Sequence, residues 1–138
     1  MHVTHKNKTF ATLLAAATGG IGLHRFYLRG LADRWGWLHA VSVPLTLLII
    51  FLGIGQYGLF QAGALVLSIL IGFIEALALG LTPDEKWDRT YNSNSGKSSN
   101  SGWPVVLLLV LTLGLGASAL TGVLARSFDL LFTGGAFG

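Results

Sequence analysis

The sequence contains no cysteine, which excludes disulfide bonds, thiolate metal ligands and a cysteine nucleophile. Charged residues are also scarce. They make up 11% of the 138 residues, whereas a soluble domain usually carries about a quarter. Hydrophobic residues make up 52% of the chain, and the mean hydropathy is +0.65. This balance is typical of an integral membrane protein.

The formal net charge of +3 is explained by Lys and Arg residues in cytoplasmic loops and beside anionic headgroups. Because the sequence has no basic run or known reader motif, we expect no nucleic-acid partner. The sequence contains no phosphate-binding loop and no hydrolase nucleophile motif. Asp84, Glu85 and Asp88 lack the spacing of an EF-hand calcium loop. We therefore expect no catalytic, cofactor-binding or metal-binding residues.

Four apolar segments predict an all-α integral membrane protein with three or four helices. Residues 35–54, 58–81 and 103–125 reach the length of about 20 residues that a helix needs to cross a bilayer. The first apolar run, 10–23, has 14 residues. It reaches spanning length only if it is extended to residue 28, past a histidine and an arginine. We therefore expect the first helix to be either short or re-entrant.

Composition divides the chain into three parts. Residues 1–92 hold the first three apolar segments and end in a charged cap. Residues 93–102 are rich in Ser, Asn and Gly, which is typical of a flexible linker. Residues 103–138 form an additional transmembrane helix and a short tail.

The distribution of Lys and Arg predicts the orientation in the membrane. If all four segments cross, the rule requires the N-terminus to be outside, with six basic residues inside and three outside. If the first segment does not cross, eight lie inside and one lies outside. Both arrangements place the 24–34 and 82–102 loops in the cytoplasm.

Small residues recur every four positions in the third and fourth apolar segments, so each set lines one helix face. The two rows are Ala64, Ser68, Gly72, Ala76 and Gly80, and Gly114, Ser118 and Gly122. Small residues let helices approach closely in lipid. The rows predict packing between the third and fourth segments of one chain or, alternatively, a contact between copies in a homo-oligomer.

A glycine-rich stretch followed by a basic and aromatic cluster ends the first apolar run. Its residues are Gly19, Gly20, Gly22, His24, Arg25, Phe26, Tyr27 and Arg29. Aromatic side chains suit the lipid interface, and the two arginines lie one helical turn apart, where they are placed to reach lipid phosphates. The cluster is interpreted either as a plain anchor or as a site for an anionic lipid or a protein partner.

Glu75 is the only acidic residue inside an apolar segment. An unpaired charge is costly there, so we expect the carboxylate to be protonated, paired or facing a polar cavity. The candidate partners are Arg25, Arg29, Arg34 and His39. One hypothesis is a buried ion pair that ties the first or second segment to the third. The other is a proton or ion relay that uses Glu75 and His39.

The stretch from Gly19 to Leu28, GGIGLHRFYL, resembles the signature of the TM-two (two-transmembrane-helix) domain proteins. Residues 84–92 are similar to the tail that follows this domain in bacterial members, so the resemblance covers about residues 6–92. It implies a small helical protein of the bacterial inner membrane and no settled biochemical activity. Many members have an Asp late in their last helix, where this chain has Glu75. The segment at 103–125 lies beyond the domain.

These observations favour a non-enzymatic accessory or scaffold subunit that binds a protein partner or anionic lipid through its His24–Tyr27 cluster. The alternative is a small oligomeric channel or transport subunit that uses Glu75 and His39.

Overall fold

The computed structural model describes residues 4–137, and every regular element in that range is a helix. The elements are α1 (Lys8–Thr18), the 3-10 helix η1 (Gly19–Ile21), α2 (Leu23–Arg29), α3 (Arg34–Phe51), α4 (Gly58–Gln61), α5 (Gly63–Leu81), α6 (Asp84–Tyr91) and α7 (Trp103–Thr133). Within the described residues, α3, α5 and α7 are long and apolar enough to cross a membrane. The predicted all-α membrane fold is confirmed.

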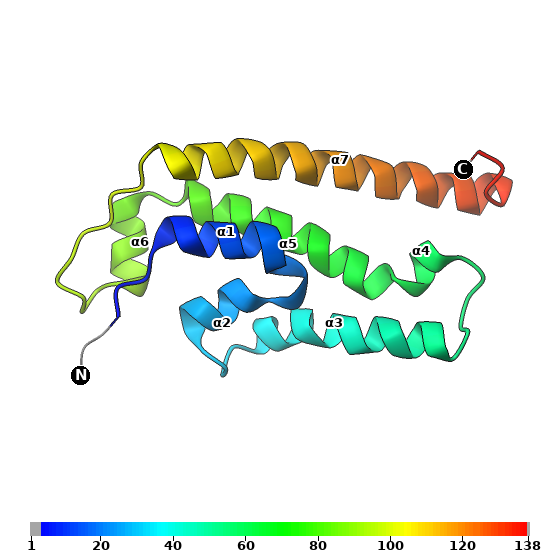
Figure 1. Ribbon diagram of the computed structural model, residues 1–138, viewed down its shortest axis with the longest axis horizontal. Coiled ribbons are helices and arrows are strands. Elements are labelled where there is room, and N and C mark those ends of the chain that lie inside the picture. Colours follow the sequence, from blue (N-terminus) through cyan, green and yellow to red (C-terminus); the bar gives the residue numbers. More distant parts are fainter. Residues whose placement is uncertain (1–3, 138) are drawn as a thin grey trace.

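The first apolar segment folds back on itself. In Figure 1, α1 runs toward η1 and α2 runs back from η1 on the same side, and the two helices are in contact. Gly22, between η1 and α2, has φ +76°, a left-handed conformation that glycine adopts without strain. A Cβ atom at Gly22 would also lie 2.7 Å from the carbonyl oxygen of Gly36. The segment is therefore a helical hairpin and not one continuous helix, and its re-entrant placement in the membrane stays a prediction.

Helix α5 occupies the centre of the bundle and contacts α1, η1, α3 and α7. Figure 1 shows that it runs antiparallel to both α3 and α7, which lie on opposite sides of it. Its row of small residues is buried from Ser68 to Gly80, and Ala64 is half-buried. The closest approach is to the hairpin. A Cβ atom at Gly72 would lie 2.6 Å from the Gly19 Cα atom.

The small-residue row of α7 does not face α5. Gly114, Ser118 and Gly122 are all exposed. A Cβ atom placed at Gly114 or Gly122 would have no neighbour within 4 Å except the backbone of its own helix. The expectation that this row packs against the third segment is therefore wrong. Gly116 faces α5 instead, because a Cβ atom placed there would lie 3.2 Å from Phe73 Cβ. It lies two positions after Gly114 and so points to nearly the opposite side of the helix. A contact between copies through the exposed row stays a prediction.

Three of the predicted segments have different bounds in the structure. The second segment forms a helix from Arg34 to Phe51 and not over 35–54. The third segment divides into α4 and α5 at Ala62. The last helix continues to Thr133, eight residues beyond the predicted end at Ala125. Arg126 does not end it because its guanidinium pairs with Asp129 one turn later on the same helix. Gly134, with φ +69°, provides the left-handed cap that does end it.

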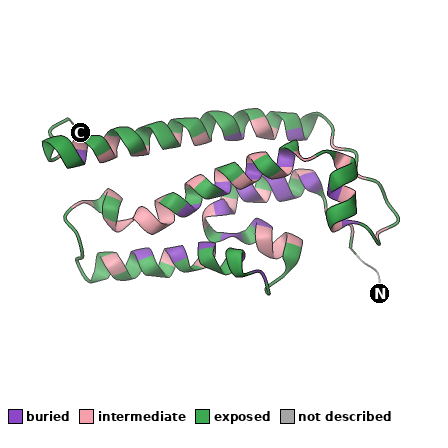
Figure 2. Cartoon of the chain, turned by 180° about the vertical axis from the view of Figure 1, so that it is seen from behind, coloured by how far each residue is buried: buried purple, intermediate pink, exposed green. Residues whose placement is uncertain are grey.

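The polar segments gather at one end of the bundle. Figure 1 shows the start of α1, the turn between α2 and α3, α6 and the 93–102 loop at the same end, and α4 and the C-terminus at the other. Figure 2 shows the buried residues concentrated where α1, η1 and α5 meet, whereas α7 is exposed along most of its length. The two loops that the sequence assigns to one side of the membrane therefore do lie together.

Replacing Gly72 by alanine is expected to separate α5 from η1, because the new methyl group meets the Gly19 backbone. We expect a loss of about 1–3 kcal/mol in the free energy of unfolding, measured by denaturation in detergent micelles. Gly114→Ala is the matched control. It adds the same methyl group in open space and should gain up to about 1 kcal/mol from helix propensity. Equal effects of the two substitutions would contradict the close contact.

Candidate functional site

Glu75 on α5 is the centre of a polar cluster that joins three helices. Its Oε1 accepts hydrogen bonds from Arg25 Nε at 2.8 Å and pairs with Arg25 Nη2 at 2.7 Å. Its Oε2 lies 2.8 Å from His24 Nε2 and 3.2 Å from His39 Nε2. Of the three states expected for Glu75, the structure shows the paired one, and Arg25 and His39 are among the predicted partners.

The start of α2 places two consecutive side chains on this carboxylate. Because Gly22 turns the chain directly before α2, His24 and Arg25 in its first turn face α5. His24 is only 2% exposed. Arg25 also donates from Nη1 to Asp33 Oδ2 at 3.0 Å. Asp33 is the N-cap residue of α3 and accepts from the Trp35 amide, so one carboxylate both starts α3 and holds the arginine.

Helix α3 contributes His39, which extends the cluster toward the middle of the bundle. Its Nδ1 lies 2.7 Å from Ser68 Oγ on α5. The Ser68 hydroxyl donates to the carbonyl of Gly20 in η1, also at 2.7 Å. Ser68, which the sequence marked only as a small packing residue, therefore joins α3, α5 and the hairpin by hydrogen bonds.

The charges in the cluster do not cancel through the arginine alone. Arg25 carries one positive charge, and Glu75 and Asp33 each carry one negative charge when ionised. A proton on one of the two histidines would make the group neutral.

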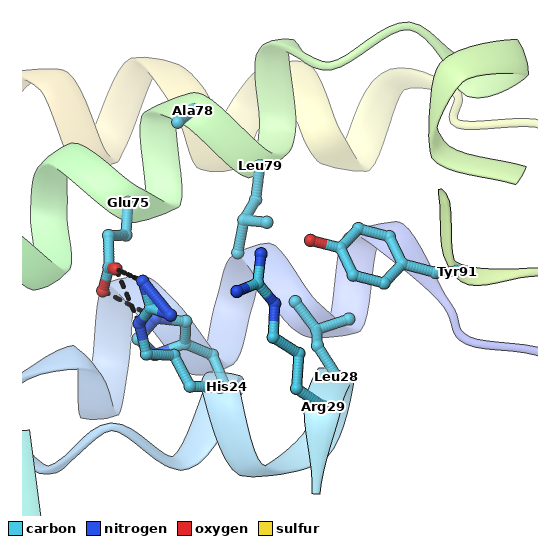
Figure 3. Close-up of a pocket in the computed structure, with 8 residues that line it drawn as sticks. His24, Leu28, Arg29, Glu75, Ala78, Leu79 and Tyr91 are labelled. Atoms are coloured by element: carbon cyan, nitrogen blue, oxygen red, sulfur yellow. Dashed lines mark hydrogen bonds and ion pairs between the residues drawn. The ribbon is translucent and has the colours of Figure 1, made fainter. Parts of the chain in front are cut away.

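Two cavities lie on either side of Glu75. The first, about 180 Å³, lies between α2, α5 and the end of α6, and His24 lines it (Figure 3). The second, about 410 Å³, lies between α3 and α5 and is lined mostly by apolar side chains, with His39 at its polar part. Arg25 and Glu75 border both. The carboxylate therefore separates the two spaces, with one histidine on each side.

The remaining aromatic residues of the predicted motif also make internal contacts. The Phe26 ring packs against Trp37 at 5.4 Å between ring centroids and lies over Gly36. The Tyr27 hydroxyl accepts a hydrogen bond from the Asn7 amide at 2.9 Å, and its ring meets Phe10 edge-on. The predicted interfacial cluster is thus used largely inside the protein.

Exposed residues lie at the C-terminal end of the motif and in the turn that follows it. Arg29 and Arg34 are exposed, and neither forms an ion pair with a described residue. Leu31 and Trp35 are 72% and 60% exposed. The turn between α2 and α3 therefore presents two free cations and two large apolar side chains at the polar end of the bundle. Arg29 and Arg34, expected as possible partners of Glu75, do not reach it.

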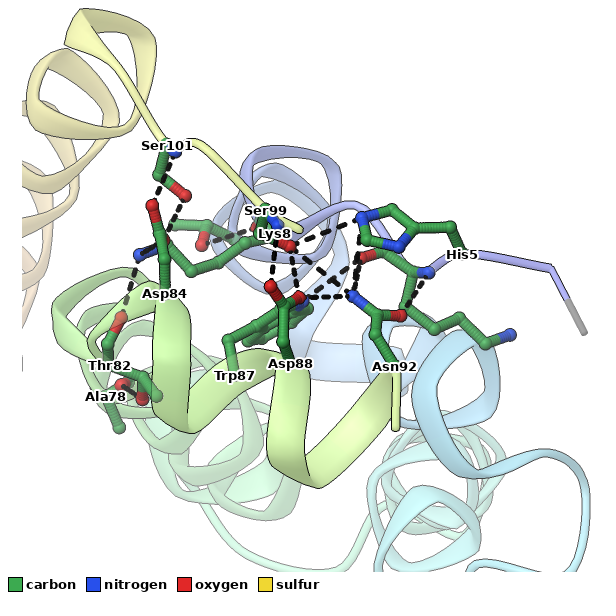
Figure 4. A network of polar contacts seen from close by, with 12 residues as sticks. His5, Lys8, Ala78, Thr82, Asp84, Trp87, Asp88, Asn92, Ser99 and Ser101 are labelled. Atoms are coloured by element: carbon green, nitrogen blue, oxygen red, sulfur yellow. Dashed lines mark hydrogen bonds and ion pairs between the residues drawn. The ribbon is translucent and has the colours of Figure 1, made fainter. Parts of the chain in front are cut away.

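A second polar cluster fixes the cap at this end (Figure 4). Lys8 at the start of α1 pairs with Asp84 Oδ1 at 2.6 Å and donates to the Thr82 carbonyl at 2.7 Å. Ser101 donates to the same carboxylate through its amide and hydroxyl. Burial alone would raise the pKa of Asp84, but the hydrogen bonds from Lys8 and Ser101 lower it to about 2.

Helix α6 also holds the N-terminal segment and the linker. Trp87 is fully buried and donates from Nε1 to the Lys6 carbonyl at 3.0 Å. Asp88 accepts from the Ser99 amide at 2.6 Å and from Asn92 Nδ2 at 2.8 Å. The second half of the linker is therefore tied to α6 at Ser99 and Ser101, although its composition is that of a flexible segment.

Sequence reasoning missed several members of these clusters. His24 was assigned to the interface and not to Glu75, and no pattern marked Ser68 as a hydrogen-bonding residue. Asp33 carried a usable signal, because an aspartate directly before a helical segment is a typical N-cap. The pairs Lys8–Asp84 and Asp88–Ser99 join residues distant in the sequence, and no local pattern predicts them.

Comparisons with known protein families, with curated proteins and with solved structures found no match to this chain. The resemblance to TM-two domain proteins therefore stays a prediction.

Replacing Glu75 by glutamine is expected to destabilise the fold, because Arg25 and two histidines then lose a half-buried anionic partner. We expect a loss of about 2–4 kcal/mol in the free energy of unfolding, measured by denaturation in detergent. Glu85→Gln is the matched control, since Glu85 is exposed and should change stability by less than about 0.5 kcal/mol. An unchanged Glu75→Gln variant would show that the cluster does not hold the helices together.

Proposed function

We propose that this chain is a non-enzymatic accessory or scaffold protein of the membrane. It binds a protein partner or anionic lipid through the turn between α2 and α3, here called the arginine turn (residues 29–35). The single observation that carries this proposal is the exposure of Arg29, Leu31, Arg34 and Trp35 at one end of the bundle.

The internal contacts of the motif support a binding role for the turn beside it. His24, Arg25 and Phe26 are engaged with α3 and α5, so they fix the position of the turn in the bundle. A rigid support lowers the ordering cost of binding. Exposed arginine and tryptophan are among the side chains that contribute most at protein interfaces, and both also suit lipid headgroups.

The orientation of the arginine turn is part of the proposal. The re-entrant hairpin leaves the N-terminus, the arginine turn and the 82–102 loop at one end. Eight Lys and Arg residues then lie on that side and one on the other. The positive-inside rule favours the cytoplasm for such an end. Together with the resemblance to bacterial proteins, this supports a place in the bacterial inner membrane.

The double substitution Leu31→Ser and Arg34→Gln tests the proposal without touching the buried cluster. We expect crosslinking and pull-down from native membranes to lose a specific protein or anionic lipid that the unchanged chain recovers. Lys97→Gln removes one exposed charge from the same end and should retain it. The proposal is wrong if the double variant recovers the same molecules as the unchanged chain in the same amounts.

A small proton-conducting or transport subunit is the second candidate function. The observation that favours it is the pair of histidines on one carboxylate oxygen, each facing a different cavity. A proton passed from His24 through Glu75 to His39 would move between those cavities. The Arg25 contacts oppose this reading, because a neighbouring guanidinium stabilises the charged carboxylate.

The unchanged protein in liposomes distinguishes this candidate from a structural role. A transport subunit should dissipate an imposed pH gradient, followed with an internal pH-sensitive dye, faster than protein-free liposomes do. His39→Gln should then remove the flux. Gradient decay at the protein-free rate would exclude the second candidate without depending on the stability of any variant.

A further inference from the structure

We propose that the cavity between α2, α5 and the end of α6, here called the Arg29 cavity, binds the phosphate group of an anionic phospholipid. The inference rests on the proposed function in that it places a lipid at the same end of the bundle, but it assigns a separate cavity that shares only Arg29 with the arginine turn.

Polar groups without described partners line the Arg29 cavity. Figure 3 shows the Arg29 guanidinium and the Tyr91 hydroxyl extending into the space beside Leu79. Neither group forms a hydrogen bond or ion pair with a described residue. His24 also lines the cavity, and its buried Nδ1 has no hydrogen-bond partner among the described residues. A buried polar atom without a partner is costly, so a ligand or water is expected there.

The charge at the Arg29 cavity favours a phosphate. Glu75 is the one acidic residue that lines it, and both its oxygens are already engaged by Arg25 and the two histidines. Arg29 is the uncompensated charge. A guanidinium binds phosphate through two parallel hydrogen bonds, and the Tyr91 hydroxyl adds a neutral donor on the opposite wall. The volume of about 180 Å³ greatly exceeds the roughly 10–15 Å³ that one water needs.

The walls and the depth of the Arg29 cavity favour a lipid over a soluble phosphate. Leu28, Ala78 and Leu79 provide apolar surface beside the donors. Glu75 lies six residues before the end of α5 at Leu81, which is about 9 Å along a helix axis. The cavity thus lies near the end of a candidate spanning helix, where lipid headgroups meet acyl chains.

Native mass spectrometry of the full chain in a mild detergent tests the site. The protein is mixed with equal amounts of phosphatidylglycerol and phosphatidylcholine, and the bound lipids are counted. We expect preferential retention of phosphatidylglycerol. Arg29→Gln should reduce that preference about tenfold, because it removes a charged hydrogen-bonding pair. Tyr91→Phe should reduce it about threefold and keeps the ring that packs against Trp87.

Arg89→Gln is the matched control, because Arg89 is exposed on α6 at the same end but lines neither the cavity nor the arginine turn. It should keep the preference. An equal loss in Arg89→Gln would overturn the proposal by assigning the effect to general surface charge. Equal retention of both lipids by the unchanged chain would also overturn it. So would binding of inorganic phosphate, detected by ³¹P NMR, without lipid retention.

The proposed function and this site can fail separately. Loss of partner recovery in the Leu31→Ser and Arg34→Gln variant, with unchanged lipid preference, would support the arginine turn alone. Loss of the lipid preference in Arg29→Gln and Tyr91→Phe, with unchanged partner recovery, would support the Arg29 cavity alone.

Discussion

The carboxylate of Glu75 joins α5 to the α1–α2 hairpin and to α3. It lies in α5, the most apolar of the three long helices, where an unpaired charge would cost several kcal/mol. Arg25 and His24 reach it from the hairpin, and His39 reaches it from α3. His24 is 2% exposed and has no described hydrogen-bond partner other than Glu75, whereas Arg25 also pairs with Asp33 and His39 also contacts Ser68. The contacts of His24 and Arg25 with the carboxylate hold the short hairpin against α5.

The polar cluster depends in turn on backbone contacts that only glycine allows. Gly72 and Gly19 bring α5 and η1 so close that a methyl group on either would meet the other backbone. This approach carries the start of α2 to the level of Glu75 on α5. A larger residue at either position would move the start of α2 away from α5 and so increase the distance from His24 and Arg25 to Glu75. Packing and electrostatics are therefore not independent here, because the glycine contact sets the geometry of the ion pairs.

At the polar end, residues that make contacts within the protein are followed directly by exposed residues. The His24–Tyr27 cluster is used to hold the hairpin against α3, α5 and the N-terminal segment. The neighbouring residues Arg29, Leu31 and Arg34 remain exposed. Helix α6 closes this end, because Trp87 and Asp84 bind the N-terminal segment. The exposed turn is thus held in place by the contacts of the His24–Tyr27 cluster within the bundle.

The sequence by itself determined the helical class, the three long apolar segments and the need of Glu75 for a partner, because these follow from composition, length and the cost of charge in lipid. It also located the α5 packing row, since four-residue spacing defines one helix face. Only the tertiary structure decided that the first segment turns back at Gly22. It also decided that His24 joins Arg25 on Glu75 and that Gly116, not Gly114, faces α5. The physical reason is that periodicity defines the faces of a helix, whereas their rotation toward neighbours depends on contacts between residues far apart in the chain.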